Sequence, residues 1–299
     1  MSKNIIVIGS CNTDMVIKAD RLPVPGETII GGSFMMNPGA TQAVAAARLK
    51  GNVHFIAKTG NDLFGKRSIE QYEDEGIHVE NIYSDPTLPS GVALIMVDMN
   101  GENSIAIASG ANGSLSPEDI RKAQPTIEKG DILLMQLEIP IETVEYAAQI
   151  ASEQGIKVIL NPAPARALSN KLLQNLYMII PNETEAEILS GIKVTDWESA
   201  RKAADIISAK GVDIVVITLG SKGALIKEKD TFHEVPVPKV KAVDTTAAGD
   251  TFCGALCVAL SEDVNVLDAV KFANKCASIT VTRMGAQPSL PYRKEIDVL

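Results

Sequence analysis

The sequence predicts an α/β protein, a three-layer, doubly wound and mainly parallel sheet with a small second β-sheet as a lid. Three observations support this prediction. Short β-branched runs alternate with longer helical patterns along most of the 299 residues. The runs are continuously apolar, as expected for parallel strands that are covered on both faces. Two segments interrupt the alternation with period-two patterns, which indicate strands of a separate sheet.

The predicted strands of the main sheet are short apolar runs, several of which end in Gly, Asn or Pro. They lie at residues 4–10, 53–58, 131–138, 157–162, 177–182 and 213–220. Amphipathic helical patterns separate them, at residues 40–50, 63–76, 141–154, 184–190 and 196–210. This alternation implies right-handed crossovers, so ligands are expected at the carboxyl ends of the strands, where polar residues collect.

The two interrupting segments, 13–36 and 90–109, contain few helix formers and predict the inserted strands of the lid. Within the second segment, Asn100 and Gly101 are a hairpin signal. The lid would cover a substrate or, alternatively, serve only as a dimerisation flap. The stretch 248–284 is rich in Ala, Cys and Ser and predicts tightly packed helices. Because repeats and linkers are absent, residues 1–299 are expected to form a single domain.

Composition and charge argue against several classes of protein. Apolar residues make up 45% and charged residues 22% of the chain, as in ordinary globular proteins. The net charge of −9 argues against a nucleic-acid backbone or an anionic membrane as partner. A small anionic ligand remains compatible, because backbone amides can bind phosphate. The N-terminal apolar run is too short for a signal peptide, and no stretch reaches the ~18 apolar residues of a membrane helix.

Cysteine and histidine spacing does not indicate a metal site. The cysteines lack a Cys-x-x-Cys pair and occur at Cys11, Cys253, Cys257 and Cys276. The histidines are scattered, at His54, His78 and His233. We therefore expect buried, reduced thiols in a cytoplasmic protein rather than disulfides or zinc.

The segment Val243–Leu256, VDTTAAGDTFCGAL, carries the most information about chemistry. Small residues at 247–249 precede a helix, so its first backbone amides can approach an anionic ligand. Asp250 lies in that first turn. It is either an ordinary carboxylate at a helix N-terminus or a base that takes a proton from a hydroxyl attacking a phosphoryl group. Spacing alone leaves both readings open.

Other glycine-rich and acidic segments narrow the chemistry. No Walker A pattern occurs, and the lone Gly9 after the first strand does not match a dinucleotide-binding motif. Thr218–Gly223 is either a plain turn or a turn whose hydroxyls and amides meet phosphates. In Pro181–Glu187, Asn182 either caps a helix or lies near a hydrated Mg²⁺ ion.

Several motifs together resemble the PfkB-type carbohydrate kinases. They are VDTTAAGDTF, PNETE, TLGSKGA, NPAPAR, GNDLFG, MQLE and TRMGAQPSLP, and they cover nearly the whole chain in the family's order. The D-T-x-A-A-G-D signature is specific, and the NPAPA and GAQPS segments resemble the ribokinase branch. The resemblance implies a ribokinase-like fold and ATP-dependent phosphorylation of a pentose, D-ribose at O5. It also implies Mg²⁺, a monovalent cation that is usually K⁺, and a homodimer formed through the lid.

The resemblance further implies roles for individual residues. At the reaction centre, Asp250 would be the catalytic base and the anion hole would comprise Ala247, Ala248 and Gly249. The nucleotide would be bound by Asn182, Thr218, Gly220, Ser221, Gly223, Gly249 and Asn274, the last near adenine. Glu185 would act with Asn182 on Mg²⁺, indirectly. The monovalent cation would be held by Asp244, by Ser289 and by the carbonyls of Thr246, Thr280, Arg283 and Gly285. The sugar would contact Asn12, Asp14, Gly39, Thr41, Glu138 and Asp250.

One segment departs from the family pattern. Asn37–Val44 reads NPGATQAV where the family has G-G-K-G-A-N-Q-A-V, and the segment after Gly26 is a few residues shorter. Thr41 therefore takes the place of a sugar-binding Asn. The loop is truncated, residues are absent from the sequence, or the pocket has diverged; the regular QAVAAARL that follows favours absent or deleted residues. Three functions stay open: a ribose kinase, a kinase for deoxyribose, another sugar or a nucleoside, and a non-catalytic sugar- or nucleotide-binding protein.

Overall fold

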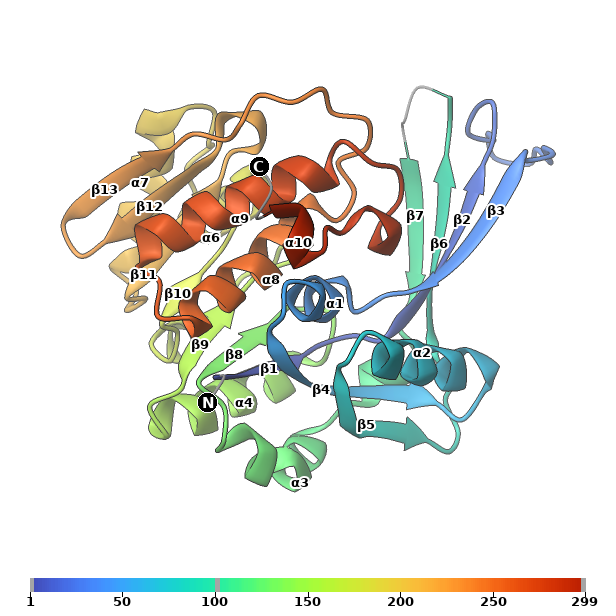
Figure 1. The fold of residues 1–299 in the computed structure, drawn as a ribbon, viewed down its shortest axis with the longest axis horizontal. Helices are drawn as coiled ribbons and strands as arrows, with labels where there is room; N and C mark the ends of the chain where they lie inside the picture. Colours follow the sequence, from blue (N-terminus) through green and yellow to red (C-terminus); the bar gives the residue numbers. More distant parts are fainter. Residues whose placement is uncertain (1–2, 100–102, 297–299) are drawn as a thin grey trace.

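A computed structural model describes residues 3–99 and 103–296, and its centre is a nine-stranded sheet (Figure 1). The strand order is β13-β12-β11-β10-β9-β8-β1-β4-β5. The strands are β1 Asn4–Ile8, β4 Asn52–Gly60, β5 His78–Asp85, β8 Ile132–Met135, β9 Lys157–Leu160, β10 Met178–Ile179, β11 Ile214–Thr218, β12 Ala224–Glu228 and β13 Thr231–Val235. All neighbours pair in parallel except β11 with β12 and β12 with β13. The mainly parallel sheet is confirmed.

Helices cover both faces of this sheet, because alternate strand residues are buried on opposite sides. In β1, Ile5 and Val7 join one apolar core while Ile6 and Ile8 join the other. The first core lies under α1 Thr41–Arg48, α2 Leu63–Asp74, α8 Ala248–Ser261, α9 Val266–Thr280 and α10 Arg293–Ile296. The second lies under α3 Pro117–Ile127, α4 Ile141–Glu153, α5 Asn170–Leu173, α6 Glu183–Ser190 and α7 Trp197–Ser208. The predicted three-layer architecture is therefore confirmed.

A separate four-stranded sheet stands beside the body, on the right in Figure 1. Its order is β3-β2-β6-β7, with strands β2 Asn12–Lys18, β3 Ser33–Pro38, β6 Gly91–Val97 and β7 Asn103–Ala108. We call it the lid sheet. Its strands come from the two predicted segments, and β6 and β7 pair antiparallel as expected of a hairpin. The predicted Asn100-Gly101 turn lies outside the described residues.

The connection between the lid sheet and α1 is short and ordered by a backbone hydrogen bond. The chain passes without a break from β3 through Gly39 and Ala40 into α1, and the Gly39 amide donates to the Asn12 carbonyl at 2.6 Å. Ala40 adopts a left-handed conformation, φ 53°, and caps the helix.

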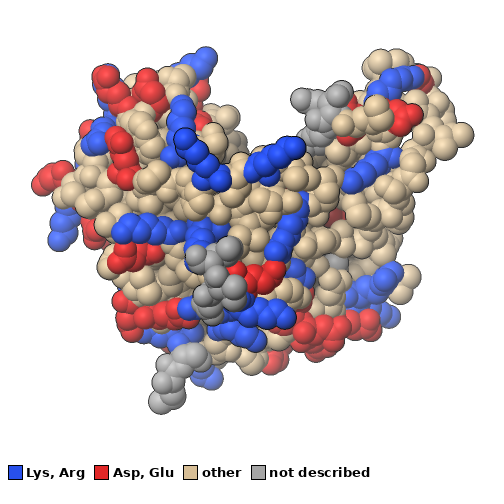
Figure 2. Space-filling model, turned by 45° about the horizontal axis from the view of Figure 1, so that its top comes forward, with Lys and Arg blue, Asp and Glu red and all other residues tan. Residues whose placement is uncertain are grey.

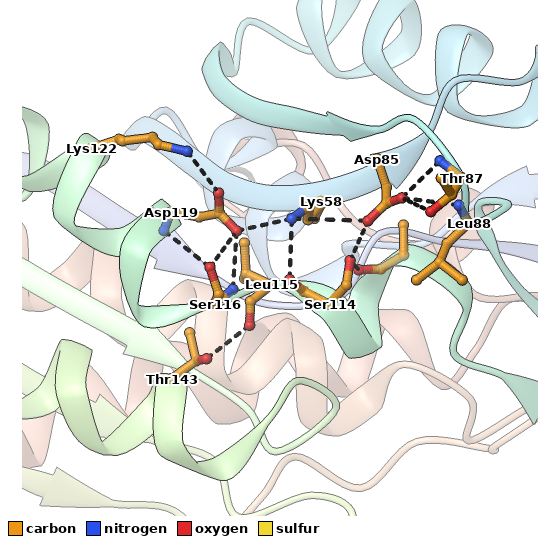
Figure 3. A network of polar contacts seen from close by, with 11 residues as sticks. Lys58, Asp85, Thr87, Leu88, Ser114, Leu115, Ser116, Asp119, Lys122 and Thr143 are labelled. Atoms are coloured by element: carbon orange, nitrogen blue, oxygen red, sulfur yellow. Dashed lines mark hydrogen bonds and ion pairs between the residues drawn. The ribbon is translucent and has the colours of Figure 1, made fainter.

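A polar network anchors two further connections of the lid sheet, before β6 and after β7 (Figure 3). The Lys58 ammonium, on β4, donates to the Ser114 carbonyl at 3.1 Å and to Asp119 at 3.0 Å. The Ser114 hydroxyl donates to Asp85 at the end of β5, and Asp85 also accepts the Leu88 amide at 2.9 Å. Residues 86–90, which lead into β6, and the 3₁₀ helix Gly110–Ser114 after β7 are thus held to the same edge of the main sheet.

Figure 2 shows the side chains of both charge signs interspersed over one face, which is hollowed between the body and the lid sheet. Among the described residues, no helix combines the length and apolar character needed to cross a bilayer. All four cysteines are buried and free, and Trp197 packs against the second core.

Two histidines differ from the sequence-based expectation. His54 and His78 are not scattered but stack, with ring centroids 4.2 Å apart and an interplanar angle of 11°. With Glu80 they place their ligand atoms within 4.8 Å of one another. Ring nitrogens bind metals in the ring plane, so two nearly parallel rings do not aim at one ion, and we assign no metal there.

Candidate active site

Two cavities meet at Asp250, at the carboxyl ends of the parallel strands. The first, of about 230 Å³, lies between the body and the lid sheet. Its lining includes Asn12, Asp14, Gly39, Thr41, Gln136, Glu138 and Asp250. The second, of about 180 Å³, lies between the starts of α6 and α8. Its lining includes Asn182, Glu185, Thr218, Ala247, Ala248, Gly249 and Asp250. Asp250 is thus accessible to a ligand from either side.

The start of α8 forms an anion site of backbone amides. Ala247 adopts a left-handed conformation, φ 62°, and no side chain caps the helix. The Thr251 amide already donates to the Ala247 carbonyl at 2.9 Å. Within the described part of the chain, the amides of Gly249 and Asp250 have no acceptor, as expected for a first helical turn. An anion beside Gly249 would gain both amides and the helix dipole.

The electrostatics of Asp250 suit a base that is buried but ionisable. Burial raises the pKa of the Asp250 carboxyl, and the nearby Glu138 charge raises it further. A hydrogen bond from Gln42, 3.0 Å from Oδ1, opposes both effects. A raised pKa brings a carboxylate nearer to the proton affinity that general base catalysis at neutral pH requires.

Polar groups of the first cavity are held in place by one another. Glu138 Oε2 accepts from the Ser10 hydroxyl at 2.6 Å and from Asn12 Nδ2 at 3.0 Å. Asn12 Oδ1 in turn accepts from Asn112 Nδ2 at 2.8 Å. Among the described residues, nothing donates to Glu138 Oε1, which leaves that oxygen available to a ligand hydroxyl.

Asp14 is the second acceptor of the first cavity. Burial raises the pKa of its carboxyl to about 7, and the charges of Glu138 and Asp250 contribute to that rise. Three carboxylates therefore converge on one cavity. Hydroxyl groups of a polyol would satisfy them as hydrogen-bond donors, while an anionic ligand would be repelled there.

In the second cavity, Asn182 and Glu185 form a reciprocal capping box at the start of α6. Asn182 Oδ1 accepts the Glu185 amide, and Glu185 accepts the Asn182 amide, both at 2.9 Å. The capping interpretation of Asn182 is therefore confirmed. Burial raises the pKa of the Glu185 carboxyl, the Asn182 amide opposes this, and the Asp250 charge adds to it.

The glycine-rich turn after β11 lies beside the second cavity. Thr218 lines the cavity, while Gly220 and Ser221 are exposed in the short 3₁₀ helix Gly220–Lys222. Gly223 has φ 112°, and a Cβ there would come within 2.1 Å of the Val235 carbonyl oxygen. Only glycine fits this turn. Asn274, on α9, is buried apart from both cavities and donates to the same Val235 carbonyl at 3.1 Å.

Asp244 joins the two loops that contain the predicted cation ligands. Its Oδ1 accepts the Thr246 amide at 2.9 Å and its Oδ2 accepts the Gly285 amide at 2.8 Å. Burial alone would raise the pKa of Asp244, but the hydrogen bonds from Thr246 and Gly285 outweigh it and lower that pKa. The group therefore stays ionised and keeps the loops together.

The other predicted cation ligands lie around the end of α9. The Thr280 hydroxyl, fully buried, lies 2.8 Å from the Thr251 hydroxyl of α8. The backbone carbonyl of Thr280 accepts the Arg283 amide at 3.0 Å. Ser289, also fully buried, donates to the Ala286 carbonyl at 2.6 Å. The structure thus brings the predicted set to neighbouring loops next to α8.

Sequence reasoning missed two groups of site residues. The first is a pair of glutamines: Gln136 donates to Gln42, and Gln42 in turn donates to Asp250. The second is an apolar wall on the lid sheet, made of Ala93, Ile95, Ile105 and Ile107. The four residues share one face of the lid sheet, since Ala93 pairs with Ile107 and Ile95 with Ile105. Period-two patterns indicated strands there but not which face would line a cavity.

A carboxylate beside an amide anion site, between a polyol-type cavity and a second polar cavity, is the arrangement of a phosphoryl-transfer enzyme. Comparison with known proteins agrees with this class. The family model described as pfkB family carbohydrate kinase matches residues 2–293, and the chain belongs to that family.

Similar proteins extend along nearly the whole chain. A ribokinase of Haemophilus influenzae is 46% identical over 298 residues, which cover 99% of this chain and 97% of that protein. A deoxyribokinase of Salmonella typhi is 39% identical over 292 residues, covering 96% and 95%. The structure of Arabidopsis thaliana ribokinase complexed with ribose and ATP has a TM-score of 0.91 at 32% identity, covering 100% of this chain and 98% of its own.

Proposed function

We propose that this protein is an ATP-dependent kinase that transfers the γ-phosphoryl group of ATP to O5 of D-ribose, giving D-ribose 5-phosphate and ADP. The position of Asp250 between the two cavities carries the proposal. Asp250 accepts the proton of the 5-hydroxyl while O5 forms a bond to the γ-phosphorus. The bond from that phosphorus to the bridging oxygen breaks, and its electron pair leaves with ADP. The free amides of Gly249 and Asp250 stabilise the charge on the transferred group.

Each of the two cavities would bind one of the two substrates. Ribose would occupy the first, where Asn12, Asp14, Glu138, Gly39 and Thr41 contact its hydroxyls. The phosphates of ATP would occupy the second, beside Thr218 and the start of α8, with the turn at Gly220–Gly223 and Asn274 further along the nucleotide. A lid that closes over the sugar excludes water, which limits ATP hydrolysis.

The residues present fit Mg²⁺ and a monovalent cation as partners of ATP. Both oxygens of Glu185 are occupied by Asn182, at 2.9 Å each, so contact with Mg²⁺ through water suits the pair better than direct ligation. Asp244, ionised, holds oxygen-rich loops together below the start of α8. A cation there would add positive potential to the anion site. Buried free thiols together with the use of ATP support a cytoplasmic location.

A sugar panel tests the proposed acceptor. We expect kcat/KM for ribose to exceed that for 2-deoxyribose about tenfold to a hundredfold, because a missing hydroxyl leaves a buried polar partner unpaired at ~1–3 kcal/mol. ADP release measures turnover, and phosphorus NMR of the product identifies the phosphorylated oxygen. Preference for 2-deoxyribose would instead support a deoxyribokinase, which Thr41 in the sugar cavity and the deoxyribokinase relative favour. Ribose binding in calorimetry without any ADP release would support a non-catalytic binding protein.

We further propose that the lid sheet is the dimer contact of a single-domain protein. The face opposite the apolar wall is itself apolar and exposed: Phe34 is 61%, Leu94 53% and Ile17 40% accessible. Ile17 pairs with Phe34 across β2 and β3, so these side chains are contiguous. An exposed apolar sheet face of this kind is typical of a protein interface.

Light scattering coupled to size exclusion tests the dimer. Phe34→Lys is expected to halve the particle mass, because a charge within an apolar interface is costly to bury. Ile188→Lys, which changes another exposed apolar residue, on α6, is the control and should leave the mass unchanged. A monomeric wild-type protein at micromolar concentration would contradict the proposal.

A further inference from the structure

Gln42, in the first turn of α1, is a buried amide that contacts the base directly. Its side chain is 4% exposed. Nε2 donates to Asp250 Oδ1 and to Asn161 Oδ1, both at 3.0 Å. Its Oε1 accepts from Gln136 Nε2 at 2.6 Å. One side chain thus links the ends of β8 and β9 to the start of α8.

The direction of these hydrogen bonds is fixed by a backbone group. Asn161 Nδ2 donates to the Ile180 carbonyl at 3.0 Å, and a carbonyl can only accept. The Asn161 oxygen must therefore face Gln42, and the amide nitrogen of Gln42 must lie between Asn161 and Asp250. A flipped Gln42 would set its oxygen against two other acceptors. Gln136 then donates to the remaining oxygen of Gln42, which completes this chain of hydrogen bonds.

A glycine noted in the sequence makes room for this chain. Gly9 follows β1, and a Cβ at that position would lie 2.1 Å from Gln136 Oε1. The Gln136 amide can lie against the end of β1 only because residue 9 has no side chain. The lone Gly9, which does not belong to a dinucleotide-binding motif, is thereby explained as part of the packing around Asp250.

We propose that Gln42 is the positioning residue of the catalytic base: it holds Oδ1 of Asp250 and leaves Oδ2 as the atom that receives the substrate proton. No described residue donates to Oδ2. The same bond favours the ionised carboxylate and so opposes the rise of its pKa that burial causes. This inference rests on the proposed function, in which Asp250 acts as the base.

Charged neighbours of Asp250 do not replace this donor. Glu138 and Asp14 face it from the sugar cavity, Glu185 faces it from α6, and the Cys253 thiol lies on its own helix. The charged forms of the three carboxylates disfavour ionisation of Asp250. Burial raises the pKa of the Cys253 thiol, which is therefore neutral. Among the described neighbours, only Gln42 offers a side-chain hydrogen to the carboxylate.

Gln42→Met tests the inference, because methionine has nearly the same length and cannot donate. We expect kcat to fall at least about tenfold and the acid limb of the kcat/KM profile to move upward by about one pH unit. The sign follows from the base: without the donor its pKa rises, so activity is lost at higher pH. Gln136→Met keeps the Gln42 donor but removes the hydrogen bond that orients it. We expect the acid limb to shift upward in this variant too, by a smaller amount.

Gln71→Met is the matched control. Gln71 Nε2 makes a similar amide–amide bond, 2.6 Å to Gln287 Oε1, between other elements. The Gln71→Met variant should leave the acid limb of the kcat/KM profile unchanged. A loss of kcat in Gln42→Met with an unmoved limb would overturn the inference and indicate a merely structural role. If Gln42→Met does not fold, the pH profile of Gln136→Met provides the test instead. An acid limb that does not shift in Gln136→Met would then overturn the inference. An Asp250→Asn enzyme that still turns over would reject the proposed function itself, which separates the two failures.

Discussion

Replacing Asp250 by asparagine is expected to lower kcat by a factor of about 10²–10⁴ while ATP still binds. Asparagine keeps the shape of the side chain and can still accept the hydrogen bond from Gln42, so the site should remain folded. It cannot take the proton of the sugar hydroxyl. ATP affinity should stay the same or increase, because the substitution removes a negative charge from beside the site of the γ-phosphate. Steady-state ADP release and calorimetric titration with ATP measure the two effects separately.

Asp263→Asn is the control for this experiment. Asp263 is an exposed carboxylate that pairs with Lys3, far from both cavities, and its replacement should leave kcat unchanged. Near-normal turnover in Asp250→Asn would reject its role as base. A variant that loses ATP binding together with kcat would show that Asp250 mainly supports the fold of the anion site.

The sequence predicted the centre of the fold better than its edges. The run at β1 is buried on both faces, and its continuous apolar character is sufficient to identify it. By contrast β5 is an edge strand, where His78 and Glu80 face solvent, and no strand was predicted there. The edge hairpin β12–β13 and helix α3, which has Pro125 in its interior, were missed as well. Edges and interrupted helices lack the regular apolar period on which such predictions depend.

Local motifs predicted the anion site, whereas long-range contacts could not be predicted. The start of α8 is encoded by neighbouring residues, so small side chains followed by Asp250 were enough to indicate it. Gln42 and Asp250 are 208 residues apart, and nothing in either local pattern indicates that they meet. The same holds for Asp14 and Glu138, whose shared cavity exists only because the lid sheet folds over the strand ends.

Replacing Asp14 by asparagine is expected to reduce activity and to stabilise the ligand-free protein above neutral pH. Loss of a charged acceptor for sugar hydroxyls should lower kcat/KM for ribose about tenfold to a hundredfold. The pKa of Asp14 is raised from 3.8 in the unfolded chain to about 7 in the fold. An acid with a raised pKa destabilises the fold when ionised. Its cost is absent below about pH 4 and complete above about pH 7.

The stabilisation by Asp14→Asn should therefore grow with pH. We expect a gain of about 2–4 kcal/mol in the free energy of unfolding at pH 8 and a much smaller one at pH 5. Urea denaturation at both pH values measures it. Asp20→Asn changes an exposed carboxylate in the same segment and should alter neither stability nor activity. Equal gains at both pH values would mean that ionisation of Asp14 is not their cause. A pH-dependent gain would show that this cavity holds its carboxylates at the expense of stability, as expected of groups that serve ligand binding rather than folding.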